Sequence, residues 1–103
     1  MYIVVLVTAS KYKEARDIAG ALIKGKLAAC VTIIKSIESV FWWEGKIDKA
    51  HEALLIIKTR KSCVVKVIKK VKSMHSYAVP EIIALPIIAG NKGYLEWIHA
   101  STK

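Results

Sequence analysis

The sequence predicts an α+β fold in which the strands of one sheet alternate with helices along a single domain. Two hydrophobic patterns support this prediction, because short runs rich in β-branched residues alternate with segments whose apolar residues recur every three or four positions. A third observation is a long β-hairpin signal centred on a tight turn at Glu44-Gly45-Lys46. The length of 103 residues suits one domain, so we expect residues 1–103 to fold as a single unit.

The first two elements are a buried strand and an amphipathic helix. Tyr2 to Val7 is a continuous apolar run, which is typical of an interior strand covered on both faces. Ser10 suits the N-cap of a helix from Lys11 to Lys24, and Gly25 suits its end. The apolar face of this helix would consist of Ala15, Ile18, Ala19, Leu22 and Ile23.

Two long strands follow, from Val31 to Trp43 and from Ile47 to Thr59, with neither proline nor glycine in either arm. Each arm could hold about 13 residues and span roughly 43 Å, whereas a compact chain of this length is about 33 Å across. Simple alternation places on one face Val31, Ile33, Ile37, Phe41 and Trp43, with Ile34, Val40 and Trp42 on the other. Exposed aromatic residues and open strand edges promote aggregation, so we expect another copy of the chain to cover the hairpin.

The rest of the chain supplies a second helix, a short strand and a terminal helix. Ser62 suits the cap of a helix whose buried face would consist of Val64, Val67, Ile68, Val71 and Met74. Pro80 and Pro86 bracket an apolar strand, and the second proline places that strand at a sheet edge. Asn91-Lys92-Gly93 then begins a brief helix that carries Tyr94, Leu95, Trp97 and Ile98.

This order of elements is the ferredoxin-like βαββαβ sandwich, here with a long hairpin between the second and third strands and a short C-terminal helix. Right-handed crossovers between parallel neighbouring strands would put both long helices on one face of the sheet. The other face would then need cover, and both faces of the hairpin carry residues of a kind that is usually buried. We therefore expect an oligomer.

Charge and cysteine content limit the partners and compartments that suit the chain. Seventeen Lys and Arg against eight Asp and Glu give a net charge of +9, which raises nucleic acid, anionic membranes and acidic ligands as partners. The lysines are scattered apart from one cluster, Lys66, Lys69, Lys70 and Lys72. We expect a solvated helix face there. Cys30 and Cys63 lack metal-site spacing and are too few for a disulfide scaffold, which favours free thiols in a reducing cytoplasm.

Several classes of protein are disfavoured by what the sequence lacks. The apolar run at the N-terminus is short and has no basic leader, so it predicts neither a signal peptide nor a membrane span. A glycine-rich phosphate loop is absent, and no nucleophile has a base at recognisable spacing, so we do not expect an enzyme. The chain has no glutamine, one asparagine and 15 isoleucines, a composition that leans toward a heat-adapted source.

The same order of strands and helices, combined with positive charge, also describes the RNA-recognition motif. That module needs exposed aromatic residues on its third strand. The corresponding strand here, Glu52 to Lys58, carries no aromatic residue. An RNA-binding module is therefore the least favoured of three functional classes.

Five segments of the chain resemble the CutA divalent-cation tolerance family. They are Lys26–Cys30, Phe41–Lys46, Leu54–Thr59, Tyr77–Ile87 and Tyr94–Ile98, in the family's order and over nearly the whole chain. The resemblance implies a ferredoxin-like homotrimer whose long hairpins lock neighbouring subunits, similar in outline to PII-like signalling trimers. It also implies a role in tolerance of copper and other divalent cations, whereas animal members are associated with anchoring acetylcholinesterase. Two such different roles show that the fold alone does not give the molecular function.

The resemblance also implies a metal site around His75. In some bacterial members of the family that the chain resembles, copper is bound by paired histidines in this loop and a thiol on the first strand. The matching positions here are Met74, His75 and Val7. Imidazole suits Cu(II) and Zn(II), and a thioether favours Cu(I). We expect a divalent metal site, with Cu(II) foremost, made of His75, Met74 and Glu81. The alternative is that His75 only hydrogen-bonds its loop or a subunit boundary.

A second expected site is a cleft between subunits. Its candidate residues are Trp42, Trp43, Lys58, Tyr77 and Trp97. The aromatic members could form a small-molecule pocket, or they could simply belong to the core of an oligomer. An interaction of Glu81 with Lys58 would be either part of a ligand site or an interface ion pair.

These observations lead to two functional hypotheses. The first is a cytoplasmic homotrimer in divalent metal tolerance that binds metal ions directly, copper foremost, without nucleic-acid or membrane partners. The alternative is a PII-like signalling or scaffolding trimer. Such a trimer would bind a small anionic ligand between subunits, or a partner protein on its projecting hairpin.

Overall fold

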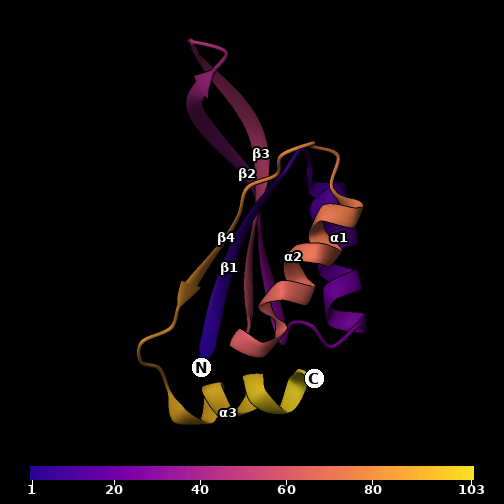
Figure 1. Cartoon of the computed structure of the whole chain (residues 1–103), viewed down its shortest axis with the longest axis vertical. Coiled ribbons are helices and arrows are strands. Elements are labelled where there is room, and N and C mark those ends of the chain that lie inside the picture. The colour runs from indigo at the N-terminus through magenta and orange to yellow at the C-terminus, as the bar shows by residue number, and fades with distance from the viewer.

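The computed structural model describes residues 1–103, and its elements follow the predicted order (Figure 1). The strands are β1 (Tyr2–Ala9), β2 (Cys30–Trp43), β3 (Lys46–Arg60) and β4 (Ile82–Pro86). The helices are α1 (Tyr12–Lys24), α2 (Val64–Met74) and α3 (Lys92–Ser101), and a 3₁₀ turn at Lys61–Cys63 precedes α2. The predicted α+β class is therefore confirmed. None of the three helices has the length and hydrophobicity that crossing a membrane requires.

The four strands form one sheet in the order β2-β3-β1-β4, and every neighbouring pair is antiparallel. The expectation of parallel neighbouring strands is wrong, because each helical crossover skips a strand. The strand β3 lies between β1 and β2, and β1 lies between β3 and β4. The central place of β1 and the edge position of β4 agree with the prediction.

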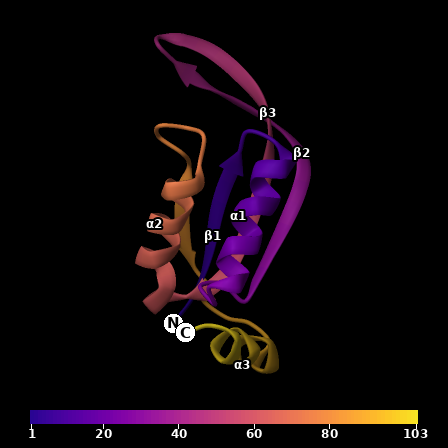
Figure 2. The same ribbon diagram turned by 90° about the vertical axis from the view of Figure 1, so that its right-hand side faces the viewer.

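The two long helices pack on the same face of the sheet, and the hydrophobic core lies between them and the central strands (Figure 2). Strand members of this core include Ile3, Val5, Val7, Leu55 and Ile57. Helix members include Ala15, Ile18, Leu22, Val67 and Val71. The opposite face of the sheet has no long helix against it, and α3 lies across the end of the sheet near both termini (Figure 1).

The hairpin of β2 and β3 projects well beyond the helices (Figure 1). Its turn consists of Glu44 and Gly45, whose φ angles are 51° and 79°. Two consecutive positive φ angles are typical of the type I′ turn that matches the twist of paired strands. The molecule measures 44 × 26 × 22 Å along its principal axes. The prediction that the arms extend beyond the rest of the domain is therefore confirmed.

A β-bulge divides β2 into two halves. Ile34 pairs with Leu54, but Ile37 pairs with Glu52, so three steps along β2 match two steps along β3. The extra residue reverses the face on which each later side chain of β2 lies. The prediction that Ile37, Phe41 and Trp43 share a face with Val31 and Ile33 is therefore wrong. The pairs on the face turned away from the core are Ile37 with Glu52, Ser39 with Ala50, Phe41 with Asp48, and Trp43 with Lys46.

Both predicted serine caps are wrong as well. Ser10 precedes Lys11, the N-cap residue of α1, and the N–H and hydroxyl of Ser10 both donate to Glu14 instead. Ser62 lies inside the 3₁₀ turn, and Cys63 is the N-cap residue of α2. The start of α1 is therefore fixed by a glutamate within the helix, which receives bonds from the residue before the cap.

Candidate functional site

A groove of about 910 Å³ lies under the curved hairpin. Three parts of the fold line it, namely the outer half of the hairpin, the end of β1 at Thr8, and the segment of residues 75–81 that joins α2 to β4, which we call the α2–β4 loop. The hairpin supplies Phe41, Trp43, Asp48, Ala50 and Glu52, among others. The loop supplies Tyr77, Ala78, Val79 and Glu81.

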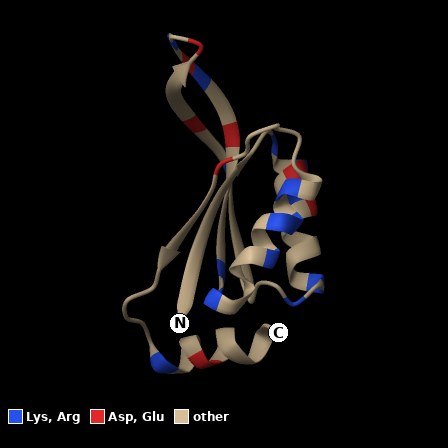
Figure 3. Ribbon diagram, in the orientation of Figure 1, with Lys and Arg blue, Asp and Glu red and all other residues tan.

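The lining of this groove is acidic although the chain is strongly basic. It contains three of the eight acidic residues of the sequence, Asp48, Glu52 and Glu81, and no Lys, Arg or His. Figure 3 shows acidic residues along both arms of the hairpin and many of the basic residues on the helices. Lys46 lines a second, smaller pocket that shares Trp43 and Asp48 with the groove. Within the groove itself the carboxylates have no basic residue among them, which favours a cationic ligand over an anionic one.

Aromatic side chains complete the walls of the groove. Phe41 and Trp43 come from β2, and Tyr77 comes from the α2–β4 loop. The bulge turns Phe41 and Trp43 to the same face as Asp48 and Glu52, so the two kinds of side chain line one cavity. Aromatic faces attract cations electrostatically. The aromatic side chains and the carboxylates of the groove therefore both favour a cationic ligand.

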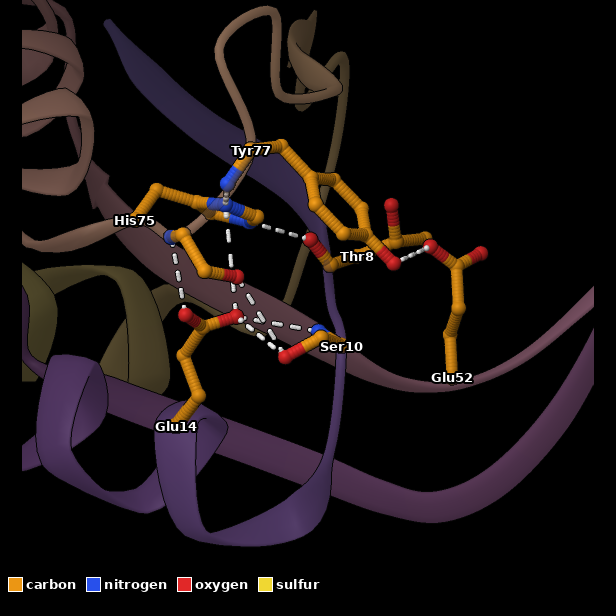
Figure 4. A network of polar contacts seen from close by, with 7 residues as sticks. Thr8, Ser10, Glu14, Glu52, His75 and Tyr77 are labelled. Atoms are coloured by element: carbon orange, nitrogen blue, oxygen red, sulfur yellow. Dashed lines mark hydrogen bonds and ion pairs between the residues drawn. The ribbon is translucent and has the colours of Figure 1, made fainter.

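Glu52 is the most buried of the three carboxylates, with only 7% of its surface exposed. Its Oε2 accepts a hydrogen bond of 2.9 Å from the hydroxyl of Tyr77 (Figure 4). Burial, this hydrogen bond and the negative charges of Glu52 and Glu14 raise the pKa of Tyr77 to about 12. The phenol is therefore protonated at neutral pH, and it ties the α2–β4 loop to β3.

His75 anchors the same loop and has no free nitrogen for a metal ion. Its side chain is 0% exposed, and Nε2 lies 2.7 Å from the carbonyl oxygen of Thr8, so Nε2 carries a proton and donates. Nδ1 accepts the N–H of Tyr77 at 3.0 Å. Because both ring nitrogens are engaged, no lone pair remains to coordinate a metal. The geometry supports the alternative in which His75 hydrogen-bonds its loop.

The three residues predicted as metal ligands do not form one site within the chain. Met74 is partly buried and packs against the hydrophobic core. Glu81 is exposed and lies in the wall of the groove. No three His, Cys, Asp or Glu side chains come close enough to hold one ion between them. A metal ion in the groove would therefore need water, or ligands from another chain, to complete its coordination.

Glu14, in the first turn of α1, links the α2–β4 loop to β1. Its Oε1 accepts the N–H of Ser10 at 2.9 Å and the hydroxyl of Ser10 at 3.1 Å. Its Oε2 accepts the N–H of Ser76 at 2.9 Å (Figure 4). Burial raises the pKa of Glu14, but the hydrogen bonds from Ser10 and Ser76 outweigh burial, and the net shift is downward. The carboxylate is therefore ionised at neutral pH.

Only two of the residues predicted to form an aromatic cleft meet in one cavity. Trp43 and Tyr77 both line the groove. Trp42 lies on the other face of the hairpin and is 73% exposed. Trp97 packs against Tyr94 on α3, with ring centroids 5.4 Å apart.

Lys58 lies away from the groove, on the sheet face opposite the helices. Its Nζ donates a hydrogen bond to the Thr32 hydroxyl and lies 3.7 Å from the Sγ of Cys30. Lys58 makes no ion pair with Glu81 within the chain. The predicted interaction of these two residues is therefore absent from a single subunit.

Asp48, Glu52 and Glu14 are site residues that the sequence did not single out. A lone charged residue at the start of an apolar stretch, as Glu52 is, gives one usable signal, because such a residue is seldom buried without a partner. Asp48 gives no signal, since its place in the groove depends on how the hairpin bends. Glu14 gives no signal of its contact with the loop, because Ser76 lies 62 positions away, although its other partner, Ser10, is only four positions earlier.

Comparison with known proteins identifies the family. Residues 3–101 match the family described as CutA1 divalent ion tolerance protein. The chain is 52% identical to "Protein CutA 1, chloroplastic" of Oryza sativa subsp. japonica, over 98% of its own length and 57% of that protein's length. It is 43% identical to the divalent-cation tolerance protein CutA of Thermus thermophilus, over 96% of each chain.

A solved structure, the periplasmic divalent cation tolerance protein CutA from Archaeoglobus fulgidus, has a TM-score of 0.97 with this chain at 46% identity, and the match covers 100% of both. The chain spans little more than half the length of the chloroplast relatives from Oryza sativa and Arabidopsis thaliana, 57% and 56% respectively. Sequence and fold thus agree over nearly the entire chain. This protein belongs to the CutA1 divalent ion tolerance protein family.

Proposed function

We propose that this protein acts in divalent-cation tolerance and binds the cation directly, in the acidic groove under the hairpin. The observation that carries the proposal is that Asp48, Glu52 and Glu81 share one cavity with no basic residue. In a chain of net charge +9, a cavity whose only charged side chains are carboxylates favours a cation over an anion. The names of the relatives refer to the same class of ligand.

The ion would be held by carboxylate oxygens and water. Carboxylates suit Mg²⁺ and Mn²⁺, and among divalent first-row ions Cu²⁺ binds most strongly to a given set of oxygen and nitrogen ligands. The carboxylates of one chain do not converge on a single point, so the ion would keep part of its hydration shell or take a ligand from a neighbouring subunit. We therefore expect weak binding, with Cu(II) preferred.

We further propose that the protein works as a homotrimer. The sheet face opposite the helices carries an apolar patch, which we call the open-face patch: Val4, Leu6, Ile34, Leu54, Ile56, Ile83 and Leu85. None of these side chains is fully buried in the single chain. Leaving such a patch in water is unfavourable, and covering it with other copies of the chain removes the cost.

We place the protein in the cytoplasm and assign it a binding role. Cys30 and Cys63 are both free thiols, which suits a reducing compartment. Named relatives include chloroplastic and periplasmic proteins, so location differs among relatives. The sequence has no glycine-rich phosphate loop and no nucleophile with a base at recognisable spacing, which favours a binding role over an enzymatic one.

Titration calorimetry with Cu(II) and Mn(II) tests the cation site. Glu81→Gln removes an exposed carboxylate of the groove, and Glu96→Gln removes an exposed carboxylate of α3 as the matched control. We expect Glu81→Gln to weaken binding at least about tenfold and Glu96→Gln to leave it unchanged. Equal affinity in all three proteins would reject the groove as the site, and so would an absence of binding to the wild type.

The scaffolding alternative has one observation in its favour. Past the bulge, two paired apolar side chains lie on the outer face of the hairpin, and Trp42 and Ile47 are 73% and 68% exposed. An anionic small ligand is disfavoured in the groove because its walls carry carboxylates. Hydroxyl-radical footprinting of the oligomer distinguishes the roles of the outer face. If Trp42 is protected from oxidation, the outer face of the hairpin is a contact between subunits. If Trp42 is strongly oxidised, that face is exposed in the oligomer and can bind a partner protein.

A further inference from the structure

The α2–β4 loop forms one wall of the groove and has little structure of its own. Outside the helices and strands, no hydrogen bond between backbone groups involves residues 75–81. The loop is fastened by side chains instead. His75 bonds the carbonyl of Thr8, Tyr77 bonds Glu52, and the N–H of Ser76 bonds Glu14 (Figure 4). The place of this wall therefore depends on a few polar contacts.

Glu14 joins more parts of the fold than the other two contacts do. Its two oxygens receive three donors, the N–H and hydroxyl of Ser10 at the end of β1 and the N–H of Ser76 in the loop. Glu14 lies in the first turn of α1, where the helix dipole favours a negative charge. Glu14 is absent from the lining of the groove, so it can affect the groove only through the loop.

We infer that Glu14 is a positioning residue of the cation groove. Its carboxylate fixes Ser76, the neighbouring Tyr77 then reaches Glu52, and the loop brings Glu81 to the same cavity. The effect on cation binding rests on the proposed function, whereas the fastening of the loop does not. Glu14 thus sets the spacing between the carboxylate of the loop and those of the hairpin without touching the cation.

The ionised form of Glu14 is the form that this arrangement needs. All three partners are donors, and a protonated carboxyl group, or an amide, would present a donor of its own to one of them. The titratable groups that face Glu14 are His75, whose Nδ1 lies 3.9 Å from Oε1, and Tyr77, whose phenol is neutral. No lysine or arginine pairs with Glu14. Protonation of this one carboxylate is therefore expected to release the loop.

Amide NMR of Glu14→Gln tests the fastening of the loop, with Asp17→Asn as the matched control. Asp17 lies on the same helix and makes an exposed ion pair with Lys13. We expect the Ser76 amide to exchange with solvent at least about tenfold faster in Glu14→Gln, because a hydrogen bond to a charged acceptor is lost. In the wild type its chemical shift should titrate below pH 4.5, the usual pKa of a glutamate, since hydrogen bonds lower this one.

In Asp17→Asn, the Ser76 amide should exchange as slowly as in the wild type, and its chemical shift should titrate over the same pH range. Protected amides in β1 and β3 show that each variant is folded. Unchanged exchange of the Ser76 amide in Glu14→Gln would overturn the inference, whatever the cation measurements give. A wild-type Ser76 shift that ignores pH in this range would also overturn it. Both readings are made without any metal.

Titration calorimetry with Cu(II) then tests whether Glu14 affects cation binding. We expect about tenfold weaker binding in Glu14→Gln, as for residues that orient ligands without contacting the ion, and wild-type affinity in Asp17→Asn. A loosened loop with wild-type affinity would overturn the positioning role. If the wild type binds no cation, the proposed function fails, and the amide exchange still decides whether Glu14 fastens the loop.

Discussion

Glu52 and Tyr77 form the contact between the hairpin and the α2–β4 loop. A carboxylate that is removed from water needs a donor, and the phenol supplies it at 2.9 Å. Burial of the phenol raises the pKa of Tyr77, and the hydrogen bond to Glu52 and the charge of Glu52 raise it further. The pair therefore contributes to stability only while Tyr77 is neutral.

Alkaline unfolding tests this pair. The pKa of Tyr77 is raised from 10.0 to about 12, so its contribution to folding is fully present below pH 10 and is lost as pH rises through 12. We predict that Tyr77→Phe loses about 1 kcal/mol of stability at neutral pH and shows less of the alkaline decline in denaturant titrations. Tyr12→Phe, which removes a hydroxyl on α1, is the control. Identical alkaline profiles for wild type and Tyr77→Phe would contradict the assignment.

At the scale of residues, the sequence could identify His75 as important but not its role. Its place in a loop between two elements indicated a polar site, and His75 does make polar contacts there, with the carbonyl of Thr8 and the N–H of Tyr77. Its actual partner is the carbonyl of Thr8, 67 positions earlier in the chain. No local pattern reports a contact at that separation, so the choice between metal ligand and loop anchor needed the fold. The metal site of His75, Met74 and Glu81 was predicted from the family resemblance. That resemblance does not report long-range contacts either.

At the scale of elements, the hairpin was predictable and its bulge was not. The turn at Glu44-Gly45 and the β-branched arms gave its position and length. The extra residue falls at Lys35-Ser36, between Ile34 and Ile37, where neither glycine nor proline marks it. Simple alternation therefore put every later side chain of β2 on the wrong face. That error hid the groove, because it separated Trp43 from the acidic residues of β3.

The turn gives a test of the hairpin's backbone. Gly45 has a φ of 79°, and a Cβ added there meets nothing within 4 Å, so Gly45→Ala should cost about 1 kcal/mol through conformation alone. Gly20→Ala, in α1 with equally open surroundings, should stabilise by about 0.5–1 kcal/mol. Urea unfolding at one protein concentration measures both. Shifts of the same sign in the two variants would contradict the type I′ turn.

At the scale of the whole molecule, a sheet with helices on one face leaves the other face to be covered. The sequence predicted this from the order of elements, although it did not give the antiparallel pairing. Sedimentation equilibrium should give a mass near three times the 11.4 kDa of the chain. Ile56→Lys, in the open-face patch, should lower that mass, because a charge would be buried between subunits. Val65→Lys, at an exposed position of α2, should not. A monomeric wild type at micromolar concentration would contradict the homotrimer.

Composition predicts high thermal stability. One asparagine and no glutamine leave few thermolabile amides, and the proposed association of subunits would add buried apolar area. We predict by calorimetry a Tm well above the roughly 45–65 °C typical of mesophile domains. A Tm within that range would contradict a heat-adapted origin.

The presence of a divalent cation in the acidic groove is tested most directly by crystals of the protein soaked in Cu(II), with diffraction measured at the copper absorption edge. We predict an anomalous peak in the groove, bound by Glu81 and close to Glu52 or Asp48, while His75 keeps its bonds to Thr8 and Tyr77. An anomalous peak on His75 and Met74, or no peak in the groove at saturating Cu(II), would contradict it.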